Sequence, residues 1–201
     1  MHSKSYRFLT PLIMVLTWAN MEAQTSHPVP RLVVNVTIDQ LRTDYMEAFS
    51  SLFGAGGFNK VMRDGRSYMD AAYPFSHIDR ASAVACIMTG TVPYDNGIVG
   101  EHWMDRKTLR PMYCVDDATC EGWLTSEKYS PVALNVSTVT DELKMATGGR
   151  ALVYSIAPDA DAAILAAGHA ADGAFWIDNA SGQWSSTSSV SYTHLTLPTI
   201  A

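Results

Sequence analysis

Residues 31–39 read R-L-V-V-N-V-T-I-D, a β-branched apolar run that ends at an acidic residue. Such a run is typical of a strand buried on both faces of a parallel sheet. Further apolar strand-like segments alternate along the chain with stretches that have apolar residues at helical spacing or carry helix caps. This alternation predicts an α/β fold, a mostly parallel sheet flanked by helices. The expected strands are 31–38, 67–73, 151–156 and 174–178, the expected helices are 41–49, 57–62, 79–90, 137–145 and 159–167, and residues 93–129 form a long polar excursion from the sheet.

Composition excludes several classes of protein. The 201 residues include 20 Asp and Glu against 14 Lys and Arg, a formal net charge of −6, and no run of basic residues. The positive surface that a binder of nucleic acid or anionic membrane needs is therefore missing. There is no sustained heptad and no apolar run of roughly 18 residues that would span a bilayer. The chain reads as one globular domain, or as part of a larger one.

The two ends of the chain differ from the rest. Residues 1–23 have the basic start, apolar centre and small-residue end of a secretory signal peptide, which predicts an exported, periplasmic or extracellular protein. The alternative for this segment is a buried N-terminal helix. Residues 190–201 resemble the translation of a sequencing adapter, and the alternative is a genuine terminal strand. Residues 24–189 are therefore expected to be the N-terminal part of the natural domain.

The three cysteines do not form a disulfide framework or a zinc motif, because no C-x-x-C pair or Cys/His cluster is present. Cys114 and Cys120 flank a short polar stretch and are candidates for a bridge in an oxidising compartment, a pairing that the sequence leaves open. Cys86 lies in an apolar helical stretch and is expected to be a small buried hydrophobe.

Asp39 and the helix capped by Asp79 are expected to meet at the edge of the sheet where α/β proteins bind ligands. In open sheets, ligands bind beyond the carboxyl ends of the strands, and a helix N-terminus directed at that edge favours anions. Asp39 ends the first strand, and the helix capped by Asp79 opens toward the same edge. An Asp at a strand end also serves as a loop cap or ion-pair partner, so its position alone leaves the role of Asp39 open.

Four stretches together resemble the alkaline phosphatase superfamily, in its branch of secreted phosphate monoesterases and nucleotide pyrophosphatase/phosphodiesterases. They are V-T-I-D-Q-L-R-T-D-Y (36–45), G-G-F-N-K-V-M-R-D-G (56–65), M-T-G-T-V-P-Y-D-N-G-I-V-G (88–100) and W-M-D-R (103–106). The resemblance implies a hydrolase with two zinc ions, in which a strand-end Asp binds one metal and a Thr or Ser at a helix N-terminus attacks phosphorus. Asp39 matches the metal ligand, and the remaining ligands would lie beyond Val190.

The chain departs from the family pattern at four positions of the substrate pocket. The nucleophile position is Arg80, and a guanidinium cannot act as an oxygen nucleophile. Glu101 replaces an Asn that hydrogen-bonds the phosphoryl group, and Asp159 and Asp161 replace a Lys and an Arg. A pocket for a dianion would thus become rich in carboxylates. We expect Arg80 to pair with Glu101 and with Asp159 or Asp161; the alternative is that these side chains point to solvent.

Other polar side chains offer weaker alternatives. Ser82 is a nearby hydroxyl, but a residue two positions along a helix faces away from position 80, which makes it a weak substitute nucleophile. His169 is expected to be structural, and His77 and His102 are loop histidines without a partner at metal-ligand spacing.

Three functions follow. The first is a catalytically impaired superfamily member that binds a ligand in the old pocket, the second an active metal-dependent phosphatase or phosphodiesterase of the cell envelope, and the third a non-catalytic envelope scaffold. A phosphate ester or another small molecule is the expected partner, and nucleic acid is not.

Overall fold

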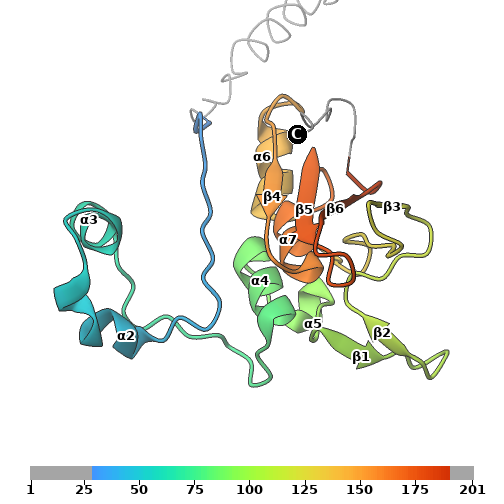
Figure 1. Ribbon diagram of the computed structural model, residues 1–201, viewed down its shortest axis with the longest axis horizontal. Coiled ribbons are helices and arrows are strands. Elements are labelled where there is room, and N and C mark those ends of the chain that lie inside the picture. Colours follow the sequence, from blue (N-terminus) through green and yellow to red (C-terminus); the bar gives the residue numbers. More distant parts are fainter. Residues whose placement is uncertain (1–28, 191–201) are drawn as a thin grey trace, which may run out of the picture. The chain divides into compact units, whose positions relative to one another are not determined.

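The computed structural model describes residues 29–190, in two units that divide between Val34 and Asn35. The signal peptide expected at 1–23 lies outside these residues, as does all but Val190 of the adapter-like tail, so both stay predictions. The described elements of the second unit are α2 (Thr43–Ala48), η1 (Ser50–Leu52), α3 (Gly57–Asp64), α4 (Arg80–Thr89), α5 (Pro93–Asn96), β1 (His102–Met104), β2 (Pro111–Tyr113), β3 (Gly122–Trp123), α6 (Val139–Ala146), β4 (Tyr154–Ile156), α7 (Ala160–Ala167), β5 (Gly173–Ile177) and β6 (Trp184–Thr187) (Figure 1).

The sheet that supports the site has the strand order β3-β6-β5-β4. Strands β4 and β5 are parallel, with Ser155 opposite Ala174, and α7 connects them, as expected for a βαβ unit. Strands β6 and β3 extend the sheet by antiparallel pairing. The 93–129 segment is therefore not wholly an excursion from the sheet, because its β3 pairs with the unexpected strand β6.

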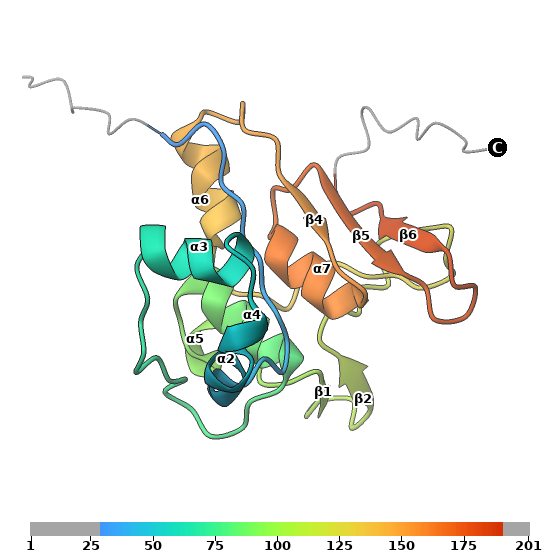
Figure 2. The same cartoon turned by 60° about the vertical axis from the view of Figure 1, so that its left-hand side comes forward.

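The core lies where α7 packs against β4 and β5 and against α4, an arrangement that can be followed in Figure 2. Ile164 and Leu165 of α7, Ala85 of α4 and Trp176 of β5 are each at most 1% exposed. The apolar residues of α7 surround the helix on nearly all sides, which is the pattern of a helix buried between other elements. This packing fixes the N-terminal ends of α4 and α7, which carry the candidate site.

The helices follow their sequence signals closely. Asp79 caps α4 through a capping box with Ser82, and Gly90 ends the helix in the left-handed conformation with φ of 68°. Thr138 caps α6 in the same way with Asp141. No helix within residues 29–190 is long and apolar enough to cross a bilayer.

Two expected strands are not formed in the described range. Residues 31–38 and 67–73 have no strand pairing among residues 29–190, and Leu32 and Val36 are 80% and 74% exposed. A strand exists only when a neighbouring backbone satisfies its N–H and C=O groups, and apolar content alone cannot supply that neighbour.

The cysteines are all free thiols. Cys114 is fully buried, and the Sγ of Cys120 donates to an Asp117 carboxylate oxygen at 3.4 Å, so the bridge that the sequence left open is not formed. The sequence predicts a buried Cys86, but this residue is partly exposed because it lies near the edge of the buried face of α4.

Candidate functional site

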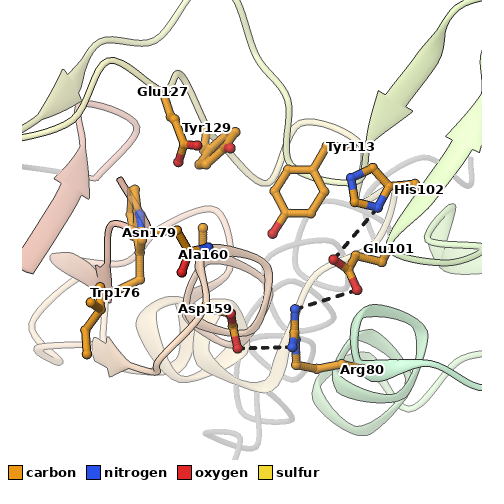
Figure 3. Close-up of a pocket in the computed structure, with 11 residues that line it drawn as sticks. Arg80, Glu101, His102, Tyr113, Glu127, Tyr129, Asp159, Ala160, Trp176 and Asn179 are labelled. Carbon is orange, nitrogen blue, oxygen red and sulfur yellow. Dashed lines mark ion pairs between the residues drawn. The ribbon is translucent and has the colours of Figure 1, made fainter. Parts of the chain in front are cut away.

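A pocket of about 250 Å³ lies where α4 and α7 begin. Arg80 is the first residue of α4, and Asp159 is the N-cap residue of α7. Figure 3 shows their side chains meeting on one side of the pocket, with two tyrosines across from them. The residues that line the pocket are Arg80, Glu101, His102, Tyr113, Glu127, Tyr129, Asp159, Ala160, Trp176, Ile177 and Asn179.

The capping residue of α4 also holds the loop that carries Glu101. The Oδ1 of Asp79 accepts the backbone N–H of Ser82 at 2.9 Å, while its Oδ2 accepts the backbone N–H of Glu101. Burial alone would raise the pKa of Asp79, but these hydrogen bonds outweigh it and lower the pKa. Asp79 thus fixes Glu101 relative to the start of α4.

Arg80 is the centre of an ion cluster. Its Nε contacts Oδ1 and Oδ2 of Asp161 at 3.1 and 3.0 Å, and its Nη1 lies 3.0 Å from Oδ2 of Asp159. The Nη2 lies 3.6 Å from Oε2 of Glu101. The expectation that Arg80 pairs with carboxylates is therefore confirmed, and both Asp159 and Asp161 take part. The Asp161 side chain is fully buried, whereas 26% of the Arg80 side chain is exposed.

The charge state of Arg80 follows from this cluster. Partial burial by itself lowers the pKa of the guanidinium, but the hydrogen bond and charge of Asp161, followed by the charges of Asp159 and Glu101, outweigh burial and raise the pKa above its ordinary value. Arg80 is permanently cationic and cannot act as a base.

Aromatic side chains form the opposite wall. The rings of Tyr113 and Tyr129 meet edge to face with centroids 5.2 Å apart, and Tyr129 lies 6.0 Å from the Trp176 ring. The Tyr113 hydroxyl accepts the backbone N–H of Asp161 at 3.2 Å. Burial, followed by the nearby charge of Asp161, raises the pKa of Tyr113, so its hydroxyl stays protonated.

The sequence does not predict the aromatic wall. Tyr113 and Tyr129 belong to the 93–129 excursion, and Trp176 lies on β5. The only sequence signal for the two tyrosines is the aromatic content of a polar segment, which does not indicate that this segment folds back over the starts of two helices; the strand predicted at 174–178 includes Trp176 but does not place it at a pocket. Glu127 reaches the pocket by the same route and is also missed by sequence reasoning.

Ser82 is not available as a nucleophile. Its side chain is fully buried, and its Oγ donates to Oδ1 of Asp79 at 2.8 Å and accepts the Asp79 backbone N–H at 3.0 Å. Because the hydroxyl serves the capping box, Ser82 does not face the pocket. This agrees with the expectation from the sequence that Ser82 faces away from position 80.

The histidines have separate roles. His169 is structural, as expected: its Nδ1 lies 3.0 Å from Oδ2 of Asp141 and its Nε2 lies 3.0 Å from the Leu134 carbonyl oxygen. His102 lines the pocket, with its ring 4.8 Å from that of Tyr113 and its Nδ1 3.8 Å from Oε1 of Glu101. His77 lies near Asp79 and is not part of the pocket lining.

The described residues do not by themselves provide a zinc site. Asp39 is exposed and does not line the pocket, and residues 29–190 contain no group of three or more His, Cys, Asp and Glu side chains that could hold a metal ion. Zinc in a protein is normally held by three or four such ligands. Asp39 alone therefore does not fit a metal centre, which needs further ligands beside it.

Comparisons with known proteins identify one protein family and several alkaline phosphatases as similar to this chain. A sequence profile of the type I phosphodiesterase/nucleotide pyrophosphatase family matches residues 33–198. The chain is 40% identical over 161 residues to alkaline phosphatase PhoV of Synechococcus elongatus. This alignment covers 79% of the present chain and 29% of PhoV. It is 32% identical over 182 residues to alkaline phosphatase PafA of Elizabethkingia meningoseptica, covering 89% of this chain and 33% of that protein. The chain thus spans about a third of the length of these relatives.

Solved structures of alkaline phosphatase PafA are also similar to this chain. The crystal structure of wild-type PafA matches with a TM-score of 0.78 and 32% identity, over 84% of this chain and 33% of that one. A PafA variant with substitutions at a threonine, an asparagine, a lysine and an arginine matches with a TM-score of 0.79. Its threonine and asparagine have the same spacing as Arg80 and Glu101, and its lysine and arginine, like Asp159 and Asp161, stand two residues apart. The likeness confirms the α/β fold expected from the sequence.

Proposed function

The chain belongs to the type I phosphodiesterase/nucleotide pyrophosphatase family of the alkaline phosphatase superfamily, and from this premise we propose that it is an exported member that has lost phosphoryl transfer. In this proposal the former substrate pocket remains as a binding site for a small molecule. The observation that carries the proposal is the ion cluster of Arg80 with Glu101, Asp159 and Asp161.

The position of Arg80 supports loss of the nucleophile. Arg80 stands at the N-terminus of a helix, where the sequence pattern places the family's attacking Thr or Ser. The threonine and asparagine substituted in the PafA variant have the same spacing as Arg80 and Glu101, and its lysine and arginine have the same spacing as Asp159 and Asp161. A guanidinium without a lone pair for attack cannot form a covalent phosphoryl intermediate. Ser82 does not supply a hydroxyl in its place, since its side chain is buried in the helix cap.

The charge of the pocket supports loss of phosphate binding as well. A threonine, an asparagine, a lysine and an arginine would together present two positive charges to a phosphate dianion. The corresponding positions here carry one positive and three negative charges. The single guanidinium is already bound to carboxylates, so a phosphate ester would have to displace an ion pair with the buried Asp161. We therefore expect phosphate monoesters to be excluded.

The remaining parts of the proposal rest on the sequence. Residues 1–23 are proposed to be a signal peptide that directs export to the periplasm or the extracellular space. Asp39 is proposed as a ligand of one of the two zinc ions expected from the family, with the other ligands supplied by parts of the full-length protein beyond the described range. Mass spectrometry of the secreted protein tests the proposed signal peptide, because the mature chain should begin at Gln24.

The proposal is tested by assaying the full-length protein with an aryl phosphate in the presence of added zinc. We expect no turnover above that of a matched blank, and no change on Arg80→Ala. Zinc-dependent turnover by the unaltered protein that Arg80→Ala leaves intact would instead favour the active envelope phosphatase or phosphodiesterase. Zinc content is measured in the same samples, so that an empty metal site is not mistaken for a defective pocket.

A further inference from the structure

Strand β4 has an open edge. The sheet order β3-β6-β5-β4 gives β4 one neighbouring strand among residues 29–190, as can be followed in Figure 2. The Val153 carbonyl oxygen and the Ala157 N–H bond to the backbone of β5 and the turn before it. Because backbone groups alternate in direction along a parallel strand, those of Tyr154 and Ile156 point away from β5. Such unpaired N–H and C=O groups can pair with a further strand.

The side chains of β4 identify the face of the sheet that is uncovered among residues 29–190. Tyr154 and Ile156 point to one face, and both are more than half exposed. The same face continues to Trp184 of β6, which stands opposite Ile177 of β5 and is also half exposed. The other face is covered by α7, and Val153 is buried there. Parallel strands are normally covered on both faces, which predicts that β4 lies inside a wider sheet in the full-length protein.

The segment N-V-T-I (35–38) already contacts the helix layer of this sheet. The Nδ2 of Asn35 lies 3.0 Å from the Sδ of Met88 in α4, and α4 packs against α7. The Oγ1 of Thr37 donates to Oδ1 of Asn35 at 3.2 Å, so these two side chains lie on the same side of the segment. Val36 is 74% exposed and lies between them. In a strand with this phase, Val36 points away from α4, as the exposed side chains of β4 do.

The handedness of the connections agrees with a strand at this place. Parallel neighbours are joined by right-handed crossovers in nearly all proteins. A strand beside the open edge of β4 precedes β4 in the chain, and the step to β4 crosses the sheet in the same direction as the step from β4 to β5. Two right-handed crossovers in one direction place their helices on the same face. The first crossover contains α4 and the second contains α7, and these two helices do pack against each other.

We infer that residues 35–38 form a fifth, parallel strand at the open edge of β4 in the full-length protein. Asn35 and Thr37 face α4 in this strand, and its two aliphatic side chains extend the uncovered apolar face. The inference goes beyond the proposed function, because neither the ion cluster nor the loss of phosphoryl transfer enters it. The added strand also carries Asp39 to the edge of the sheet where β4 leads into α7.

Disulfide trapping in the full-length protein tests this strand order. Val36→Cys is combined in turn with Tyr154→Cys and with Ile156→Cys, the two positions that the phase of the strands allows. Neighbouring strands lie about 4.8 Å apart, within the range of Cα separations that a disulfide spans. The control combines Val36→Cys with Trp184→Cys, an exposed position on the same face but three strand spacings away, about 14 Å. Peptide mapping by mass spectrometry identifies the bridge, so the native cysteines stay in place.

We expect one of the two test pairs to bridge in at least about half of the molecules under mild oxidation, and the control pair in fewer than about a tenth. No bridge in either test pair, or an equal yield in the control, overturns the inference. Amide hydrogen exchange of the unaltered full-length protein gives a second reading, because the amides of Tyr154 and Ile156 should be protected. Rapid exchange of these amides overturns the inference too. Protection without a bridge to position 36 also overturns it, since another strand then occupies the edge.

Discussion

Arg80 is bound to a carboxylate that is shielded from water. The side chain of Asp161 has no exposed surface, and its charge is compensated by the Nε of Arg80 and by the Ala162 backbone N–H at 2.8 Å. Forming a buried ion pair costs much of its Coulombic gain in desolvation, but removing one partner leaves a buried charge alone. The residues of the ion cluster therefore also contribute to the integrity of the fold.

Arg80→Ala should lower the free energy of unfolding by about 3 kcal/mol, because it strands the buried Asp161 carboxylate. The control Lys128→Ala removes half of an exposed pair with Glu121 and should cost less than about 1 kcal/mol. Denaturant unfolding of the full-length protein measures both. In a protein that also carries Asp161→Asn, Arg80→Ala should lower the free energy of unfolding by less. An equal loss with and without Asp161→Asn would contradict the claim that Arg80 stabilises the fold through Asp161.

Asp141 gives the fold a predictable dependence on pH. Burial tends to raise its pKa, but the Thr138 backbone N–H, the His169 ring and the Ala170 backbone N–H outweigh burial and lower the pKa below 3.8. A lowered carboxyl pKa stabilises the fold above the unfolded-state pKa, and this stabilisation disappears as pH falls through the folded-state value. Asp141→Asn should therefore destabilise at pH 7 by about 1–3 kcal/mol, and much less at a pH below the folded-state pKa of Asp141, which itself lies below 3.8. Urea unfolding at the two pH values measures the difference, and an equal cost at both would contradict this role.

At the scale of elements, the N-terminus of α4 joins a helix cap to the pocket loop. Asp79 accepts hydrogen bonds from the helix and from the Glu101 backbone, so one side chain sets the position of two members of the site. Losing a cap costs about 1 kcal/mol, and losing a further buried hydrogen bond about another 1 kcal/mol.

Asp79→Ala should therefore destabilise the protein by about 2 kcal/mol, whereas Asp79→Asn, which keeps an acceptor for the cap, should cost about half as much. Thermal unfolding in the same buffer compares the two variants with the unaltered protein. Equal destabilisation by Ala and Asn would contradict the hydrogen-bonding explanation.

Helices and strands differ in how far the sequence predicts them. The caps at Asp79 and Thr138 are local signals, and the helices begin where those signals place them. A strand depends on a partner that local sequence does not name. Residues 31–38 have strand composition yet no pairing in the described range, whereas the polar β6 is a strand because β5 and β3 flank it.

In the candidate site too, the sequence predicts some residues and misses others. The sequence predicts that Arg80, Glu101, Asp159 and Asp161 lie together, because the family pattern places them at one pocket and their charges require pairing. It does not predict Tyr113, Tyr129 and Glu127, because the long segment that brings them back across the pocket has no periodicity to indicate its path.

At the scale of the whole molecule, the apolar segment at 31–38 has no strand partner among residues 29–190. Leu32 and Val34 are 80% and 70% exposed, and the chain spans about a third of the length of its curated relatives. Exposed apolar surface of this kind is unfavourable in water. We expect the segment to pair with other strands in the full-length protein.

Amide hydrogen exchange tests this expectation. The amides of residues 31–38 should exchange rapidly in a fragment of residues 24–189 and slowly in the full-length protein, because only paired backbone amides are protected. The fragment alone should lack a cooperative unfolding transition. A cooperative transition with protected amides at 31–38 in the fragment would contradict the expectation.

In the proposed function, four substitutions replaced a phosphate site by the ion cluster. The most direct measurement restores the set in the full-length protein as Arg80→Thr, Glu101→Asn, Asp159→Lys and Asp161→Arg, and follows zinc-dependent hydrolysis of an aryl phosphate beside the unaltered protein. We predict hydrolysis by the restored protein and none by the unaltered one. Equal hydrolysis by both, with equal zinc content, would contradict the replacement of the phosphate site.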